Sequence, residues 1–595
     1  MGGFFGCYDR IDLSSGTTER IPIPEAILQR YLGGVGLGSW LLSVESPPGC
    51  DPLAAEAALV FAFSPLVGTP LTTSAKLAVV GKSPLTGYLS DGLSGSDFAI
   101  AGKRRGVDAL VFVGTCPQPS EWIHGQVRAT QCWGLSAAAT EARLGAEGRV
   151  AAIGIAGENL VRFASISNGG RHAGRGGLGA VMGSKRLKAV VVGGTRRTPL
   201  SEPGRVGALA RHLSQQSLGD ATARYRELGT ISNLATFNRM ATLPTRNFRQ
   251  SRFEGADSLS PEKLSSQRTK TRTACANCTI GCEHRYSHSG NSSTRIEYES
   301  LFALGPLCGI GDPEAVLAAA RRCDELGLDT ISAGATVAFA MECQERGLLE
   351  DADAPRTGRA EDLMKCLAAM GERRGIGDSL AEGSLRLALK IGQDSLDFAP
   401  QVKGLEMAGY EPRALQAMAL GFAVSTRGAD HNRSSAYEVD FSGKANRLHG
   451  DARTAHFAVT TEERAAVMDS LILCKFLRGV FVDFYAEAAQ LLSAVTGWSV
   501  DAADLESVGH RIVNLRKAFN IREGWKPTDD TLPERFFREA LDEGPSAGAQ
   551  LSRRQLGEMI RSYNRARGWS PDGFLDEATQ SEIARDLALG REARA

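Results

Sequence analysis

The sequence changes character once, near residue 200, and this change constrains the fold more than any other feature. Before it, short apolar runs such as residues 58–66 (ALVFAFSPL) and 108–115 (DALVFVGT) alternate with glycine and proline. Runs of this length between turn residues are typical of β-strands. After it, apolar residues recur at helical spacing, as in residues 314–328 (EAVLAAARRCDELGL) and 556–569 (LGEMIRSYNRARGW). We therefore predict an α+β protein.

A chain of 595 residues exceeds a single hydrophobic core, so several domains are expected. We predict a β-rich domain over residues 1–199 and two mainly helical domains over residues 200–400 and 401–595. The last residues, 583–595 (IARDLALGREARA), are expected to form a frayed helix.

Composition excludes several classes of protein. Lysine plus arginine equals aspartate plus glutamate, at 68 each, so no global charge attracts nucleic acid or an anionic membrane. No apolar run reaches the ~18–20 residues of a membrane span. The N-terminus lacks a basic region followed by an apolar one, so no Sec signal is expected. Twelve scattered cysteines then indicate reduced thiols in a cytoplasmic protein.

Three cysteines lie within eight positions of residues 273–286 (TACANCTIGCEHRY): Cys275, Cys278 and Cys282. Soft thiolate ligands select zinc, copper(I) or an iron–sulfur cluster. A nearby histidine, His284 or His288, could complete a Cys3His zinc site. A 4Fe–4S cluster needs a fourth cysteine, which is often remote. Spacing alone does not choose among the downstream candidates, which are Cys308, Cys323, Cys343, Cys366 and Cys474.

Two glycine-rich segments raise the question of phosphate binding. Residues 81–87 (GKSPLTG) contain Gly-Lys-Ser, but Lys76 stands where a P-loop needs its first glycine, which disfavours an ATPase. Residues 174–179 (GRGGLG) match G-x-G-x-x-G, but NGGRHA precedes them in place of an apolar strand. Backbone N–H groups of this loop could still contact a phosphate.

Two segments that each have an aspartate at their second position share a sequence pattern, which we call their skeleton. In residues 323–330 (CDELGLDT) and 468–476 (MDSLILCKF), Asp324 aligns with Asp469 and Asp329 with Cys474. Taken alone, both segments would be ordinary helix ends. Likewise, the glutamates around Tyr298 could belong to a solvated face, and a lone histidine such as His431 is more often structural than catalytic.

Together these motifs resemble one family, the aldehyde ferredoxin oxidoreductases, which carry tungsten or molybdenum on two pterins beside a 4Fe–4S cluster. The resemblance runs nearly end to end. It includes residues 82–95 (KSPLTGYLSDGLSG), the cysteine segment, EYES (297–300), CDELGLDT, RGADH (427–431) and YNRARGWSPDGF (563–574). It implies that the cofactor and the cluster lie at the interfaces between the predicted domains.

The resemblance implies a ligand set for the cluster, with Cys474 completing Cys275, Cys278 and Cys282. It also implies two pterin-binding motifs, and their residues are Asp324, Gly327, Leu328, Asp329, Asp469 and Leu473. The second motif has Ile472 where the family commonly has glycine. That departure puts the backbone's close approach to one pterin in question.

The glycine-rich loops of the first domain are implied to contact the pterin phosphates, which would share a Mg²⁺ ion. The implied cofactor contacts there are Asn168, Arg175, Gly176 and Gly177. Lys76 occupies the place of an arginine between pterin and cluster. Lysine keeps the positive charge but lacks the planar fork of donors, so the coupling between pterin and cluster is expected to differ.

For the chemistry, the resemblance assigns Glu299 and His431 to the substrate pocket. Glu299 is the expected general base on water, and His431 the expected hydrogen-bond donor to an aldehyde oxygen. The expected partner is ferredoxin or a ferredoxin-like subunit, and a homodimer is a further implied assembly. The alternative is a low-potential reductase of the same family, acting on benzoyl-CoA or another acyl or carbonyl substrate. A zinc-stapled scaffold without catalysis is the alternative from a different class.

Overall fold

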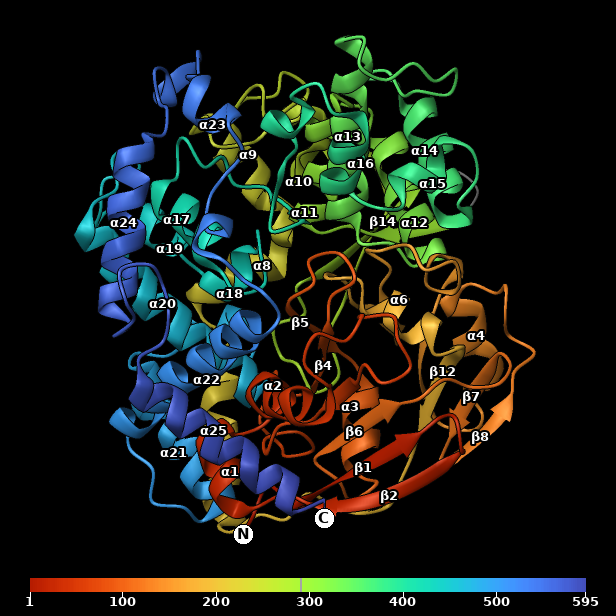
Figure 1. Ribbon diagram of the computed structural model, residues 1–595, viewed down its shortest axis with the longest axis vertical. Coiled ribbons are helices and arrows are strands. Elements are labelled where there is room, and N and C mark those ends of the chain that lie inside the picture. The colour runs from red at the N-terminus through yellow and green to blue at the C-terminus, as the bar shows by residue number, and fades with distance from the viewer. Residues whose placement is uncertain (289–291, 595) are drawn as a thin grey trace.

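The computed structural model describes residues 1–288 and 292–594 (Figure 1). Two six-stranded sheets occupy the first third of the chain, where the short apolar runs predicted strands. The first sheet has the order β2-β1-β6-β3-β4-β5, with β1 and β6 parallel and the other pairs antiparallel. Its strands are β1 (Cys7–Asp12), β2 (Thr17–Pro22), β3 (Leu59–Ala62), β4 (Lys76–Lys82), β5 (Leu89–Gly95) and β6 (Ala109–Val113).

The second sheet has the order β11-β10-β9-β12-β7-β8. Its strands are β7 (Ser120–Ile123), β8 (Gln126–Ala129), β9 (Arg149–Ile153), β10 (Ile166–Asn168), β11 (Arg171–Ala173) and β12 (Leu187–Val192). The two sheets meet where β11 packs on β5. A side chain at Gly92 of β5 would lie 2.9 Å from the Cβ of Ala173, so glycine permits this close approach.

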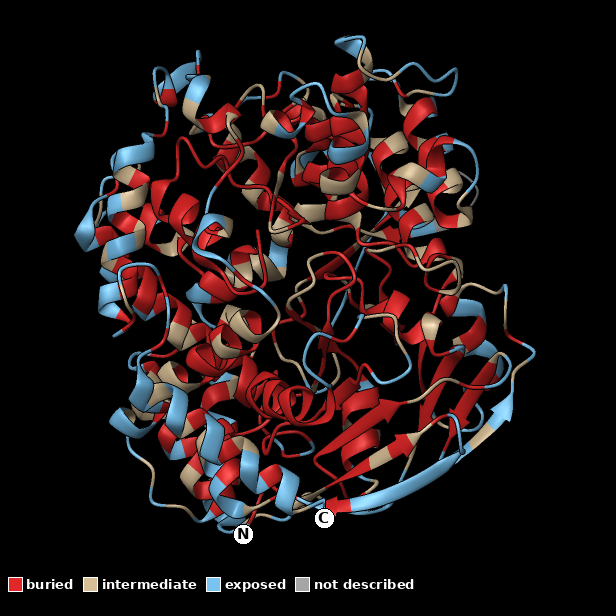
Figure 2. Ribbon diagram, in the orientation of Figure 1, coloured by how far each residue is buried: buried red, intermediate tan, exposed pale blue. Residues whose placement is uncertain are grey.

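Six helices accompany these sheets: α1 (Glu25–Tyr31), α2 (Gly34–Glu45), α3 (Asp97–Lys103), α4 (Ala137–Leu144), α5 (Ile155–Glu158) and α6 (Leu178–Ser184). Helix α2 is buried along its whole length, as Figure 2 shows. The glycines of its sequence GVGLGSWLLSVE allow this packing, because a Cβ at Gly38 would lie 2.5 Å from Val80 of β4.

The rest of the chain is mainly helical. The helices between residues 200 and 400 are α7 (Pro203–Gln216), α8 (Asp220–Leu228), α9 (Asn233–Arg239), α10 (Pro261–Gln267), α11 (Tyr298–Leu304), α12 (Pro313–Leu326), α13 (Thr330–Glu345), α14 (Ala360–Glu372), α15 (Ile376–Leu380) and α16 (Ser384–Ile391). A three-stranded antiparallel sheet lies among them, formed by β13 (Lys270–Thr273), β14 (Glu283–His288) and β15 (Ser292–Arg295).

A short hairpin, β16 (Gln401–Val402) and β17 (Leu405–Glu406), opens the last third. The helices that follow are α17 (Gln416–Val424), α18 (His431–Ser434), α19 (Tyr437–Phe441), α20 (Ala452–Leu471), α21 (Phe484–Thr496), α22 (Ala502–Arg522), α23 (Arg535–Arg538), α24 (Arg553–Ala566) and α25 (Glu577–Glu592).

Helix α2 joins the start of the chain to its end. It packs on α20, α22 and α25 as well as on β3 and β4. Trp40 donates its indole N–H to the carbonyl of Asp586 at 3.0 Å, and Tyr31 donates its hydroxyl to the carboxylate of Asp586 at 2.6 Å. The helix expected at residues 583–595 is present as the second half of α25, which runs to Glu592 and is held on α2 at Asp586 by these contacts.

The predicted α+β class, with a β-rich first part followed by helical parts, is confirmed. One continuous cluster of buried apolar side chains runs from Phe4 to Ile583 and draws on all three predicted domains. The domain boundaries remain a prediction. Among the described helices, none combines the length and the apolar character that a membrane crossing requires.

Candidate redox site between the sheets and the helices

The three clustered cysteines lie in the turn that joins β13 to β14. A loop of the first sheet holds this turn in place. The Asn277 side chain donates to the carbonyls of Thr69 and Leu71, at 3.1 and 2.7 Å. The Asn277 carbonyl in turn accepts from the N–H of Thr73 at 2.8 Å. Asn277 itself has φ 52°, a left-handed conformation that asparagine tolerates better than most residues.

Cys474 follows the end of α20 and lies with the three clustered thiols. Burial is the main cause of the raised pKa of Cys282, and the charges of Glu297, Cys474, Cys275 and Cys278 add to it. Cys278 shares two of these neighbours, since its pKa is raised mainly by burial and further by the charges of Cys474 and Cys275. The structure thus brings the four predicted ligands together.

Lys76 opens β4 beside these thiols, paired in register with Gly95 of β5. Burial alone would lower its pKa, but the charges of Cys474, Cys275, Asp469 and Cys282 outweigh burial and raise it. A side chain at Gly95 would lie 2.9 Å from the Sγ of Cys275. Glycine is therefore required where the edge of the first sheet meets the cysteine turn.

The histidines of the zinc alternative have other partners. His284 Nε2 lies 3.1 Å from the carbonyl of Arg226, and His288 Nε2 lies 2.8 Å from the hydroxyl of Thr294. Within residues 1–288 and 292–594, no three histidine, cysteine, aspartate or glutamate side chains converge on one metal-ion position.

The two acidic motifs adopt the same local structure. Helix α12 ends on Gly327, which is left-handed at φ 80°, and the N–H of Leu328 returns to the carbonyl of Cys323 at 2.9 Å. Helix α20 ends on Ile472, also left-handed at φ 63°, and the N–H of Leu473 returns to the carbonyl of Met468 at 2.9 Å. The shared sequence skeleton therefore encodes a repeated helix-ending turn.

Each of these turns packs against a glycine of the first domain. A Cβ at Gly154 would lie 2.4 Å from the carbonyl oxygen of Leu326. A Cβ at Gly34 would lie 2.5 Å from the carbonyl oxygen of Asp469 and 3.0 Å from the side chain of Ile472. The motifs are thus fixed to the sheets through close backbone contacts.

The non-glycine residue in the second turn leads to a stability prediction. A left-handed β-branched residue costs about 1–2 kcal/mol, but burial of a whole isoleucine side chain contributes about 2–5 kcal/mol. Ile472 is completely buried, so Ile472→Gly is expected to lower the free energy of unfolding, by roughly 1–4 kcal/mol. Denaturant unfolding followed by circular dichroism measures the change.

The matched control is the equivalent position of the first motif. Gly327→Ala places a Cβ 3.0 Å from the backbone N of Gly154 and forces a left-handed alanine, so it should also destabilise, by about 1–2 kcal/mol. A more stable Ile472→Gly variant would show that conformational strain outweighs packing at this turn.

The first aspartates of the two motifs contact different basic residues. Asp324 Oδ1 lies 3.1 Å from His172 Nε2, and 40% of the Asp324 side chain stays accessible. Asp469 is buried and accepts from Arg433 at 3.0 Å, with Lys475 at 3.1 Å on its other oxygen. Asp329 caps α13 by accepting from the N–H of Ile331 at 3.1 Å.

The glycine-rich loop leads from β11 into α6. Gly176 and Gly177 are left-handed, at φ 85° and 75°. A Cβ at Gly176 would lie 1.9 Å from the hydroxyl of Ser90, and one at Gly177 would lie 1.9 Å from the carbonyl oxygen of Arg162. The strand before the loop has only three residues and pairs antiparallel, so this is not the parallel strand of a dinucleotide fold.

Asn168 lies at the end of β10, buried beside this loop. Its Oδ1 accepts from the hydroxyls of Ser94 and Ser96, which orients the amide. Its Nδ2 is buried with no hydrogen-bond partner. Asn168 therefore keeps one buried donor without a partner beside an amide oxygen that is fully engaged.

Each of the three guanidinium nitrogens of Arg175 contacts an oxygen atom of the protein. Its Nη1 donates to the carbonyl of Ala429 at 2.9 Å, its Nη2 donates to the carbonyl of Glu406, and its Nε lies 3.3 Å from Asp329. Asp430 lies 3.4 Å from Nη1. Arg175 thus ties the glycine loop to the first acidic motif and to the loop before α18.

Glu299 and His431 face each other at the first turns of α11 and α18. Oε1 of Glu299 lies 3.5 Å from Nε2 of His431, too far for a hydrogen bond. Oε2 accepts from the N–H of Gly409 at 2.9 Å, and the hydroxyl of Tyr298 donates to the carbonyl of Gly409 at 2.6 Å. Oε1 of Glu299 and Nδ1 of His431 are buried without a hydrogen-bond partner.

Burial shifts both groups toward their neutral forms. It raises the pKa of Glu299 to about 7 and lowers the pKa of His431 to about 3. The histidine is therefore a neutral imidazole at working pH, while the carboxyl titrates near neutrality. Such a pair suits proton transfer by Glu299 and hydrogen bonding by His431.

Aromatic rings enclose this pair. Tyr410 stacks on the His431 ring with centroids 5.2 Å apart, and Tyr437 stacks on Tyr410 at 4.9 Å. Phe237 packs edge-on against Tyr298 at 5.0 Å. The apolar walls explain why burial dominates the pKa of both Glu299 and His431.

A buried charge network is a part of the site that the sequence reasoning missed. Asp91 of β5 accepts from Arg516 of α22 at 2.8 Å and forms an ion pair with Arg433 of α18 at 2.5 Å. Arg427 lies 3.9 Å from the same carboxylate. The signal available in the sequence was the charged residues inside the glycine-rich SDGLSGS and STRGADHNR segments.

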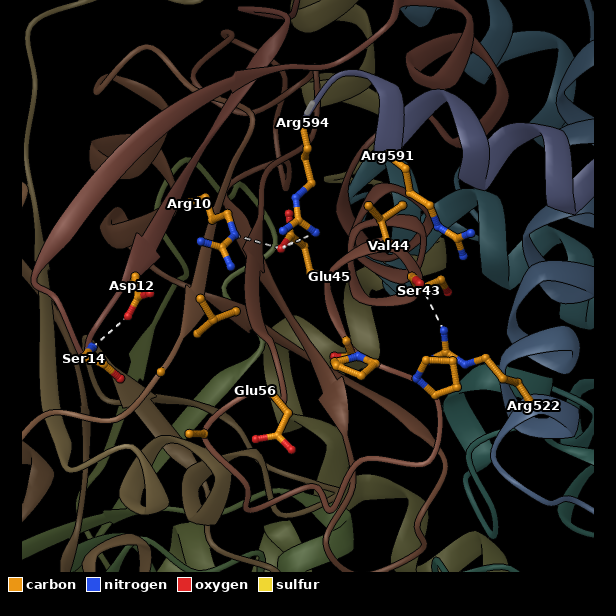
Figure 3. Close-up of a pocket in the computed structure, with 16 residues that line it drawn as sticks. Arg10, Asp12, Ser14, Ser43, Val44, Glu45, Glu56, Arg522, Arg591 and Arg594 are labelled. Carbon is orange, nitrogen blue, oxygen red and sulfur yellow. Dashed lines mark hydrogen bonds and ion pairs between the residues drawn. The ribbon is translucent and has the colours of Figure 1, made fainter.

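A large surface pocket of about 580 Å³ lies elsewhere, between β1, α2 and the end of α25 (Figure 3). Glu45 accepts from Arg10 at 3.1 Å and lies 3.3 Å from Arg594. None of the predicted site residues lines this pocket, so it is not part of the candidate site.

Two family models match most of the chain. Residues 9–194 match the family model described as aldehyde ferredoxin oxidoreductase, N-terminal domain, and residues 209–584 match the model for domains 2 and 3. The chain therefore belongs to the aldehyde ferredoxin oxidoreductase family, and the predicted resemblance is confirmed.

Similar proteins include two tungsten-containing aldehyde ferredoxin oxidoreductases. The one from Pyrococcus furiosus is 36% identical over 98% of this chain and 99% of its own length. The one from Thermococcus kodakarensis is 35% identical over the same shares. The structure also resembles the active-site complex BamBC of benzoyl coenzyme A reductase, with a TM-score of 0.84, 24% identity, and coverage of 99% of this chain and 98% of that one. This last likeness shows the fold.

Proposed function

We propose that the protein oxidises an aldehyde to the carboxylic acid at a tungsten or molybdenum centre held by two pterins. Electrons then leave through a 4Fe–4S cluster to ferredoxin or a ferredoxin-like subunit. The observation that carries the proposal is the facing of Glu299 and His431 at 3.5 Å in an enclosed site, each with an unpartnered polar atom. The relatives named as aldehyde oxidoreductases support the same activity.

The residues around the proposed pterin site fit a large polar group. Buried donors and acceptors without partners are costly unless something satisfies them, and several lie around the site. These atoms are the hydroxyl of Ser90, Nδ2 of Asn168, Oε1 of Glu299, Nε of Arg427, Nδ1 of His431, and Nε of Arg433. The turns at Gly327 and Ile472 would hold the two ring systems, and Asn168, Gly176 and Gly177 would lie at the phosphates with a Mg²⁺ ion.

The four thiols fit an iron–sulfur cluster better than a single ion. Cys275, Cys278, Cys282 and Cys474 are close enough for their charges to act on one another, yet they do not converge on one ion position. A cubane cluster takes one cysteine at each iron, so its ligands stand farther apart than those of zinc. Lys76 would lie between this cluster and the pterin.

The bound metal centre would supply the acceptor for the two electrons of the oxidation. Glu299 would remove a proton from the water that attacks the carbonyl carbon, because its free Oε1 is a carboxylate oxygen with no other partner. His431 would donate a ring N–H to the aldehyde oxygen as negative charge develops there. The Tyr410 ring holds the imidazole in plane, and Tyr298 fixes Gly409, which in turn orients Glu299.

A pH dependence follows from the raised pKa of Glu299. The base must be ionised, so kcat/KM should rise with pH through about 7 and fall roughly tenfold for each unit below it. His431, with its pKa lowered to about 3, should contribute no second limb in this range. Steady-state rates from about pH 5.5 to 8.5 test this. A flat profile would contradict the role of Glu299.

The proposed function is tested by metal content and by turnover. The purified protein should hold about one tungsten or molybdenum and about four irons per chain. It should reduce a viologen dye when an aldehyde is added. Stoichiometric zinc without iron would refute the proposal. Dienoyl-CoA formation from benzoyl-CoA with a strong reductant, and no aldehyde oxidation, would favour the reductase alternative.

We place the protein in a reducing cytoplasm. All twelve cysteines are free, which suits a compartment that keeps thiols reduced. The proposed partner is an electron carrier. Assembly into a homodimer stays a prediction.

A further inference from the structure

Four arginines and no lysine line the surface pocket that Figure 3 shows. They are Arg10 of β1, Arg522 of α22, Arg591 of α25 and Arg594 just beyond it. Each guanidinium group offers a planar fork of N–H donors that fits the oxygens of a carboxylate or a phosphate. A pocket of this kind attracts an anion if the protein leaves part of these donors and charges unsatisfied.

One buried carboxylate, Glu45, lies between two of these arginines. Its Oε2 accepts from Nε of Arg10 at 3.1 Å and lies 3.3 Å from Nη1 of Arg594. Its Oε1 accepts from the hydroxyl of Tyr8 at 2.6 Å. Among the described residues, the other two nitrogens of each guanidinium group have no partner. Two positive charges thus share one negative charge, and one positive charge is left.

A second buried carboxylate, Glu523, repeats this arrangement beside Arg522. Its Oε1 accepts from Nε of Arg522 at 2.8 Å, and its Oε2 accepts from Nζ of Lys82 at 2.5 Å. Nη1 of Arg522 donates to the carbonyl of Ser43 at 3.0 Å, but Nη2 is buried without a partner. One positive charge is left here too, together with a buried donor of the kind that almost always has an acceptor.

The other two acidic residues of the pocket, Asp12 and Glu56, lie near a buried lysine. The Lys185 ammonium donates to the carbonyls of Ala55 and Gly114, at 3.0 and 3.3 Å, and both of these residues line the pocket. Burial lowers the pKa of Lys185 to about 8, and nearby charges, among them those of Glu56 and Asp12, oppose this shift. Lys185 is therefore mostly charged at pH 7, so this group of three leaves one negative charge.

Arg591 adds a charge that the protein does not neutralise. Its side chain is exposed, and it has no ion pair or hydrogen bond within residues 1–288 and 292–594. The groups around Glu45 and Glu523 leave one positive charge each, and Arg591 supplies a third. The group around Lys185 cancels one of the three, so the net charge around the pocket is about +2 at pH 7.

We propose that this pocket binds a small metabolite through a phosphate monoester group. Such a group carries about −1.5 to −2 charge at pH 7, which matches the charge that the protein leaves. Its oxygens can accept from several guanidinium groups at once. The pocket of about 580 Å³ has room for a small organic body beside the phosphate, against the apolar side chains of Val44, Pro47, Pro48 and Val113.

The test is calorimetric titration of the holoenzyme with inorganic phosphate, at fixed ionic strength and without other multivalent anions. The holoenzyme is used because its cofactor would occupy the glycine-rich loop, which is the other proposed phosphate site. We expect saturable binding of about one phosphate per chain, weakened about tenfold or more by Arg591→Ala, since a charge-assisted contact is lost. The matched control is Arg585→Ala, which removes an exposed arginine of the same helix that does not line the pocket. It should leave the affinity within about twofold.

Thermal unfolding supplies a second readout. The pocket joins β1 to the ends of α22 and α25, so a ligand bound only by the folded chain should raise the unfolding temperature with a saturating dose dependence. Phosphate also stabilises proteins because it is excluded from their surfaces, and that effect does not saturate. A rise that does not saturate and is equal in the wild type and Arg591→Ala would overturn the site.

Two further measurements address the chemical class of the ligand. Arg522→Lys keeps the positive charge but loses the planar fork with its unpartnered Nη2, so phosphate binding should weaken about threefold or more. Succinate carries the same charge on two separate carboxylates and should bind more weakly than phosphate. Equal binding of succinate and phosphate would contradict the assignment to a phosphate group. Equal affinity for phosphate in the wild type and Arg591→Ala, or an equal loss in Arg585→Ala, would overturn the site.

Discussion

Glu299→Gln is expected to lower kcat for aldehyde oxidation by about 10²–10⁴-fold. Glutamine keeps the shape of the side chain and its amide oxygen still accepts from the N–H of Gly409, but it cannot take a proton from water. Tungsten or molybdenum, iron content and the unfolding temperature should match the wild type, so the loss would be chemical. Stopped-flow reduction of viologen by an aldehyde measures it.

The control is Glu297→Gln in the same segment. Glu297 accepts from the hydroxyl of Thr230 at 2.5 Å and lies 3.3 Å from Arg295, so both of its oxygens have partners in the protein. Its loss should change kcat by less than about threefold. Near-wild-type activity in Glu299→Gln, or an equal loss of activity in Glu297→Gln, would contradict the proposal that Glu299 is the general base.

Cys474→Ala is expected to remove the iron–sulfur cluster. Cubane clusters depend on a cysteine at each iron, so iron should fall well below four per chain and the visible absorption of the cluster should disappear. Viologen reduction should drop by at least about 10²-fold, because electrons then lack their exit. Iron analysis and electron paramagnetic resonance of the reduced protein measure the loss.

Cys366→Ala is the matched control. Cys366 is a buried cysteine of α14 and was an equal candidate for the fourth ligand on spacing alone. Its substitution should leave about four irons in place. A full iron content in Cys474→Ala, or a loss of iron in Cys366→Ala, would show that Cys474 is not the fourth ligand.

The strands, the helices and the helix-ending turns could be predicted because each depends on a few residues that are neighbours in the sequence. Apolar runs between turn residues gave the strands, and the skeleton shared by residues 323–330 and 468–476 gave two equivalent helix ends. Family resemblance, and not spacing, pointed to Cys474 as the residue that joins the cysteine turn.

The remaining parts depend on contacts between distant residues, for which periodicity has no signal. The placement of Arg175 near phosphate stays a prediction, but its contacts with Asp329, Glu406 and the Ala429–Asp430 loop, which lie more than 150 positions away, could not be read from the sequence. Asp91 and Arg516 pair across more than 400 positions. Ile472 shows a related limit, since a left-handed isoleucine contradicts local preference and is held by tertiary packing.

The burial of α2 has a consequence for synthesis of the chain. This apolar helix is complete once residue 45 is made, but its partners α20, α22 and α25 are the last large helices to leave the ribosome. Until then, the part of the α2 surface that packs on these three helices has no partner and needs protection from aggregation. A nascent chain that stops before residue 452 would therefore keep that surface exposed, which makes this protein a candidate for chaperone dependence during translation.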